Sequence, residues 1–254
     1  MRARSLLLVL LLGSAPALAE TPPSLPPPKT VQEAILQLGA TSDQGLVAGL
    51  KNLTMACRGS LRLSARDDPA LGARLPELAK TGSVEVRKGV MDAGRCVRPA
   101  AFVTLLEIEL AAPEAAVRAY AAEGAARVDD PSVVPALLSA LDKRKAACKT
   151  EELAAEEVEV CVWLTYASGA VLSRADRDSR ERVAKAAAEL LEAPHPKLRE
   201  VAVETLASAK LKVYSAPVAA LIQRETRAGG FKKANDRALI SRFEAHLAAL
   251  KKGD

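Results

Sequence analysis

The sequence predicts an all-α protein, and three observations point to that class. First, 49% of the 254 residues are hydrophobic but only 3% are aromatic, so small and aliphatic side chains supply the apolar content. Second, the chain contains 50 alanines, and alanine and leucine have the highest helix propensities, whereas sheets favour β-branched and aromatic residues. Third, prolines recur about thirty residues apart, which indicates repeated helical units.

Residues 1–19 have the pattern of a cleavable signal peptide. Two arginines precede a run of seven apolar residues at 6–12, and Ala17-Leu18-Ala19 matches the small-residue cleavage site. The run is too short to cross a membrane, because a spanning helix needs about 20 apolar residues. We therefore expect cleavage after Ala19 and a mature protein in the periplasm or outside the cell.

A proline-rich linker is expected over residues 20–29. The stretch 21–28 reads TPPSLPPP, and such a composition favours an extended polyproline II conformation that acts as a spacer. The folded domain is then expected over residues 30–254.

The repeated units are visible first as a proline register. Pro69, Pro99 and Pro131 are spaced by 30 and 32 residues, and each precedes an apolar run at helical spacing. Proline suits the first position of a helix, where no backbone hydrogen bond is lost, and Asp68 and Asp130 can cap the helices that follow.

A second register precedes the proline register. The pairs Val86-Arg87, Val117-Arg118 and Leu198-Arg199 each fall early in another helical segment. A further pair of helices is expected between the last two, over 158–172 and 177–191. Each unit is therefore a helix–turn–helix, and alanine and glycine at the seams allow its helices to approach closely.

The stretch that shows the unit best is Pro113–Leu141, with a Val-Arg pair, an Ala/Gly seam, an Asp-Pro turn and a Val-Pro-x-Leu-Leu helix. It resembles the HEAT-repeat family, in particular the bacterial HEAT-like repeats of the phycobilisome-lyase type. Residues 83–110 and 196–223 match more loosely, and an insertion at 142–158 departs from the unit length. The resemblance implies a right-handed α-solenoid (an α-α superhelix) of about five HEAT-like helical-hairpin repeats, whose concave surface binds other proteins without catalysis.

The four cysteines, Cys57, Cys96, Cys148 and Cys161, would meet an oxidising compartment after export, and their even number suggests two disulfides. Three connectivities exist, and we favour Cys57–Cys96 with Cys148–Cys161. One helix over 148–161 would hold its ends about 20 Å apart, beyond disulfide reach, so this pairing predicts a break near 149–154. Buried free thiols remain the alternative.

Two groups of residues are candidates for binding a partner. Trp163 and Tyr166 lie three apart on one helix and could form a binding hot spot, although aromatic residues also pack in cores. Residues 205–254 hold ten Lys or Arg against four Asp or Glu. The basic candidates there are Arg224, Arg227, Lys232, Lys233 and Arg237.

No catalytic or metal-binding pattern is present in the sequence. The two histidines, His195 and His246, have no partner at a zinc-ligand spacing, and no glycine-rich phosphate loop occurs. The glutamates at 151–159 suit a helix N-terminus better than a calcium site. We therefore expect no enzyme activity, metal or cofactor, and an exported protein-binding scaffold. The alternative is a solenoid that binds nucleic acid or an anionic surface through its basic C-terminal region, which export and a modest net charge disfavour.

Overall fold

The computed structural model describes residues 25–128, 130–227 and 234–252, and all regular structure in these ranges is helical, which confirms the all-α class. Thirteen α-helices are present in the described residues. They are α1 (Val31–Gln37), α2 (Asp43–Cys57), α3 (Arg62–Arg66), α4 (Pro69–Thr81), α5 (Val84–Gly94), α6 (Pro99–Leu110), α7 (Ala115–Ala126), α8 (Val134–Arg144), α9 (Ala155–Ala170), α10 (Arg177–Glu189), α11 (Pro196–Ala209), α12 (Ser215–Arg227) and α13 (Ala234–Lys251).

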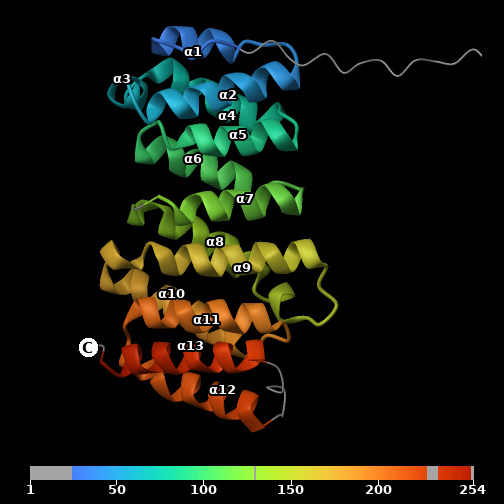
Figure 1. The fold of residues 1–254 in the computed structure, drawn as a ribbon, viewed down its shortest axis with the longest axis vertical. Coiled ribbons are helices and arrows are strands. Elements are labelled where there is room, and N and C mark those ends of the chain that lie inside the picture. The colour runs from blue at the N-terminus through green and yellow to red at the C-terminus, as the bar shows by residue number, and fades with distance from the viewer. Residues whose placement is uncertain (1–24, 129, 228–233, 253–254) are drawn as a thin grey trace, which may run out of the picture.

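Consecutive helices pack as pairs, and the pairs follow one another in chain order along the long axis (Figure 1). The pairs are α1–α2, α4–α5, α6–α7, α8–α9, α10–α11 and α12–α13, and the short α3 precedes the second. The described residues thus form six helix pairs, one more than the five or so units expected.

The pairs form two layers. Layer A holds the first helix of each pair, and layer B holds the second (α2, α5, α7, α9, α11 and α13). Neighbouring helices lie closer in layer B: α9 packs extensively against α7 and α11, whereas α6 and α8 touch over fewer residues. A Cβ atom on Gly169 of α9 would lie 3.0 Å from the Thr205 Cα of α11. Small residues therefore set the closer spacing of layer B.

The proline register marks helix starts, with one difference. Pro69 and Pro99 are the first residues of α4 and α6, and Asp68 Oδ1 accepts a hydrogen bond of 2.9 Å from the Leu71 amide. Pro131 instead begins the 3-10 turn η1 (Pro131–Val133), and α8 starts only after it. A second proline at position 135, in the first turn of α8, is accommodated there because its missing amide would have no intrahelical partner.

The arginine register has a structural cause. Arg87 and Arg118 are buried, and Arg199 is largely so. Arg118 donates to the carbonyls of Ala112 and Pro113 in the α6–α7 turn, and Arg199 makes the same bonds, at 2.8 Å, to the two residues at the equivalent positions, 193 and 194. Arg118 and Arg199 thereby each close the turn within their own pair, whereas Arg87 bonds the carboxylates of Glu109 and Glu114 instead.

The same arginines also reach the next pair. Arg118 pairs with Glu157 of α9, and the Arg199 Nε lies 2.9 Å from Glu225 Oε1 of α12. Arg118 and Arg199 therefore each bind a turn on one side and a neighbouring pair on the other, and Arg87 reaches the next pair through Glu109 and Glu114.

The insertion at 142–158 and the unit that follows it have the expected helices. Helices α9 and α10 match the segments predicted at 158–172 and 177–191. The insertion is a 3-10 turn, η2 (Ala147–Lys149), followed by a non-helical connection before Ala155. This confirms the break predicted near 149–154.

Part of the expected proline-rich linker lies against the first helix pair. The carbonyls of Leu25 and Pro26 accept hydrogen bonds from Asn52 (3.1 Å) and Gln37 (2.8 Å), and Pro28 is buried. The predicted signal peptide, residues 1–19, and residues 20–24 lie outside the described residues. Within the described part of the chain, no helix has the length and apolar character needed to cross a bilayer.

Candidate binding surfaces

The cysteines meet in the two favoured pairs. The Cα atoms of Cys57 and Cys96 are 5.7 Å apart, and those of Cys148 and Cys161 are 6.0 Å apart, both within the range of disulfides. The first pair joins the end of α2 to the α5–α6 connection, and the second joins η2 to α9. All four side chains are buried, so each pair fastens layer B to a connection beside it.

A groove runs over the outer surface of layer B, across α2, α5, α7 and α9. It consists of two adjoining hollows of about 580 and 210 Å³ that share Lys88 and Tyr120. Met55 lies in the larger hollow and is 48% exposed, while Trp163 and Glu159 lie in the smaller. We call this surface, marked by these five residues, the aromatic groove.

Trp163 and Tyr166 form an edge-to-face pair at the α9 side of the groove. Their ring centroids are 5.6 Å apart and the rings are inclined by 82°. Both side chains are half-buried, and Trp163 also packs against the core. Trp163 therefore packs partly against the core and partly lines the groove.

Tyr120, which no sequence pattern predicts as a binding residue, lies on α7 and faces the same groove. Its hydroxyl donates a hydrogen bond of 2.7 Å to Asp92 Oδ2 of α5. Burial and this hydrogen bond raise the pKa of Tyr120 to about 12, so the hydroxyl stays protonated. No local pattern links Tyr120 to Trp163, because the two meet only through the packing of α7 on α9.

The charged residues beside the groove are largely paired with one another. Lys88 lies 2.9 Å from Glu85, Arg95 lies 2.9 Å from Asp92, and Glu123 pairs with Arg127. These pairs are partly exposed and add little stability. The groove thus offers apolar and aromatic surface within a rim of mixed charge.

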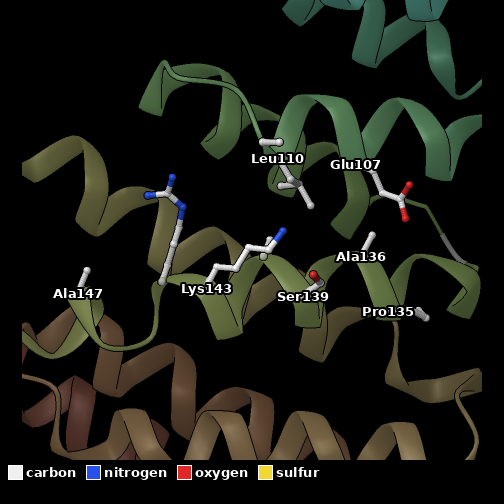
Figure 2. A pocket seen from close by; sticks show the side chains of 10 residues that line it. Glu107, Leu110, Pro135, Ala136, Ser139, Lys143 and Ala147 are labelled. Atoms are coloured by element: carbon white, nitrogen blue, oxygen red, sulfur yellow. The ribbon is translucent and has the colours of Figure 1, made fainter.

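A further hollow, of about 650 Å³, lies on the opposite layer between α6 and α8 (Figure 2). Glu107 and Leu110 of α6 face Pro135, Ser139 and Lys143 of α8 across it. Most of its remaining wall is alanine, and no histidine or second carboxylate lines it to activate Ser139. The hollow follows from the wider spacing of α6 and α8 in layer A.

Of the basic C-terminal candidates, three lie in the described residues, on α12 and α13. Arg224 pairs with Glu192 and donates a hydrogen bond of 3.0 Å to the Leu191 carbonyl. Arg227 is exposed at the end of α12 and Arg237 is exposed on α13. Lys232 and Lys233 lie outside the described residues.

The two histidines and the glutamates at 151–159 lie among other parts of the folded chain. The His195 Nε2 lies 3.2 Å from the Thr150 carbonyl, and His246 is half-buried on α13. Glu157 accepts hydrogen bonds from Arg118 and Arg144. In the described ranges, no group of three or more His, Cys, Asp or Glu side chains is arranged to hold a metal ion.

No family model and no curated protein matches this sequence. Among solved structures, the chain is similar to the crystal structure of an engineered protein, with a TM-score of 0.57 and 13% sequence identity. The match covers 87% of this chain and 97% of the engineered one. At this identity the similarity concerns the fold alone: the helix arrangement recurs over nearly the whole length of the engineered chain.

Proposed function

We propose that this protein is an exported, non-enzymatic scaffold that binds another protein, and that it is built as a right-handed α-solenoid of HEAT-like repeats. The stacking of six helix pairs in chain order supports the solenoid. The recurrence of a Pro-led helix and an arginine-closed turn supports the repeat. In a solenoid each repeat buries its apolar surface against its neighbours, which leaves one long face for binding.

The binding face in this proposal is layer B. Helices of layer B lie closer together than those of layer A, and a stack curves toward the layer with the smaller spacing. Layer B is therefore the concave side, and the aromatic groove lies on it. Concave solenoid faces are extended surfaces suited to a polypeptide partner.

The observation that carries the proposal is the convergence of Tyr120, Trp163 and Met55 in one groove. Aromatic residues dominate binding hot spots because they bury much area at little entropic cost, and methionine adapts to different shapes. An apolar side chain of the partner would enter beside Trp163, and the partner backbone would follow the groove toward Met55.

Export is supported by the two cysteine pairs, since such pairs persist as disulfides in oxidising compartments. Sequencing of the mature protein from its native cells should find Glu20 as the first residue. A mature protein that retains residue 1 would overturn the export proposal.

The binding proposal is tested by affinity purification from the periplasmic and secreted fractions at physiological salt. We expect the wild-type chain and Leu63→Ala to retain the same partner, because Leu63 is an apolar residue 80% exposed on α3, away from the groove. Trp163→Ala should lose it, with unchanged helix content by circular dichroism. A partner retained equally by Trp163→Ala would contradict the assignment of the groove.

The nucleic-acid alternative gains no specific support. Carboxylates neutralise Arg224, and Arg242 lies 2.9 Å from Glu200. Phosphate contacts are strongest at low salt, so the proposed function predicts no DNA binding even there.

A further inference from the structure

A cluster of arginines lies apart from the aromatic groove, where α2, α5 and α7 end. Arg62 and Arg66 of α3, Arg95 after α5 and Arg127 after α7 line one pocket of about 410 Å³. No carboxylate occurs among the described residues that line it. We call it the arginine pocket.

The floor of the arginine pocket is apolar. It consists of the Cys57–Cys96 pair, Val97, Phe102 and parts of Pro99 and Val128. Phe102 is 2% exposed and belongs to the core, so the floor is fixed by the packing of α6. The pocket therefore combines a rigid apolar floor with a charged rim.

The charges of the rim are only partly compensated. Arg95 pairs with Asp92 and Arg127 with Glu123, both outside the pocket. Neither Arg62 nor Arg66 forms an ion pair with any residue that the structure describes. Arg66 also attracts the adjacent carboxylate of Asp67, which pairs with Arg98, so an excess of positive charge remains at this opening.

The stabilising effect of a positive charge at a helix C-terminus accounts for only two of these four arginines. Arg95 and Arg127 are the C-cap residues of α5 and α7, where a positive charge complements the helix dipole. Arg62 instead begins the single turn of α3, and Arg66 ends it one turn later on the same side. Four guanidinium groups on one rim repel each other unless an anion lies between them.

We infer that the arginine pocket binds a phosphate monoester that carries an apolar group. A phosphate monoester has about −1.5 to −2 charges at neutral pH, which suits the excess of positive charge at the opening. Guanidinium groups bind phosphate oxygens in bidentate geometry, better than a lysine does. The apolar group of the ester lies on the floor formed by Val97 and Phe102, and the pocket volume is within the range of small-ligand sites.

Calorimetric titration with phenyl phosphate, phenyl sulfate and inorganic phosphate tests this assignment at about 0.15 M salt. We expect phenyl phosphate to bind with a Kd of about 1 mM or tighter. Phenyl sulfate has the same shape but one negative charge, and inorganic phosphate lacks the apolar group, so both should bind at least about tenfold more weakly.

The variant is Arg62→Gln with Arg66→Gln, which removes both positive charges from exposed positions. It should weaken phenyl phosphate binding by about tenfold or more. The matched control is Arg177→Gln with Lys197→Gln, which removes the same charge from exposed residues of α10 and α11 and should leave binding unchanged.

Three results would overturn the assignment: no binding of phenyl phosphate at about 10 mM, equal binding by the Arg62/Arg66 variant, or equal affinity for phenyl sulfate. Flotation with vesicles of phosphatidic acid or of phosphatidylcholine identifies the source of the ester. Selective flotation with phosphatidic acid indicates a lipid headgroup. Phenyl phosphate binding without flotation indicates a soluble ester, and both results uphold the site.

Discussion

At the scale of single residues, the buried arginines carry the most information. The Val-Arg motif is recognisable in the sequence, but its function is not, because the carbonyls and carboxylates that Arg118 contacts lie in a turn and in the next helix pair. A buried arginine is tolerated only when its charge and donors are satisfied. Arg118 meets most of this requirement, and its Nε alone has no hydrogen-bond partner.

Arg118→Met should destabilise the protein by about 3–5 kcal/mol, because it leaves two turn carbonyls without their donor and leaves Glu157 with Arg144 alone. Urea denaturation measures the change. Arg127→Met is the control on the same helix, since its side chain is 51% exposed and its ion pair with Glu123 contributes less than about 1 kcal/mol. Equal losses from both variants would show that the turn contacts of Arg118 are unimportant.

Glu109 on α6 is the most deeply buried carboxylate described, with Oε2 2.8 Å from Arg87 Nε and no hydrogen-bond partner for Oε1. Burial outweighs the attraction of Arg87 and raises the pKa of Glu109 to about 7 from an ordinary value of 4.5. Because the folded state holds the proton more tightly, this side chain favours folding below pH 4.5, and that contribution is lost as the pH rises to 7.

The free energy of unfolding of the wild type, relative to Glu109→Gln, should therefore fall by up to about 3 kcal/mol between pH 4.5 and 8. Denaturation of both proteins across this range measures the difference, and the variant cancels the titration of all other groups. A difference that stays constant, or that rises with pH, would mean that Arg87 keeps Glu109 ionised.

At the scale of helices, the seams between layer B neighbours decide the spacing. Gly169→Ala should cost about 1–3 kcal/mol, because the new Cβ would lie 2.7 Å from the Thr205 Oγ1 and 3.0 Å from its Cα. Gly72→Ala in α4 is the control, because its Cβ would meet no atom within 4 Å and helix propensity should stabilise it by about 1 kcal/mol. Thermal unfolding of both variants checks the expected opposite signs.

The insertion at 142–158 is held by the Cys148–Cys161 pair. Replacing both cysteines by serine should lower stability by about 3 kcal/mol, since the bridge closes a short loop of 13 residues. Alkylation in denaturant before reduction, read by mass spectrometry, should modify none of the four cysteines. Labelling of Cys148 or Cys161 without reductant would favour the free-thiol alternative.

At the scale of the whole molecule, the sequence predicted composition-driven features well and spatial features poorly. The helical class, the break near 149–154 and the cysteine pairing follow from propensity, spacing and the reach of a disulfide, which act over short stretches. The aromatic groove and the arginine pocket do not follow from such local signals. Tyr120 and Trp163 of the groove lie far apart in the chain, and so do Arg62 and Arg127 of the pocket. The charge of the C-terminal arginines does not predict their contacts, since Arg224 pairs with Glu192, which no local pattern indicates.

The proposed scaffold makes its most direct prediction for photo-crosslinking in the native cells. A photoreactive phenylalanine at position 88, within the aromatic groove, should form one discrete covalent adduct with another protein. The same group at position 139, in the layer A hollow, should form no adduct. An excess of unlabelled wild-type protein should compete for the partner and suppress the adduct at position 88, whereas an excess of the Trp163→Ala variant should not. The absence of an adduct at position 88, or equal adducts at both positions, would contradict a binding face on layer B.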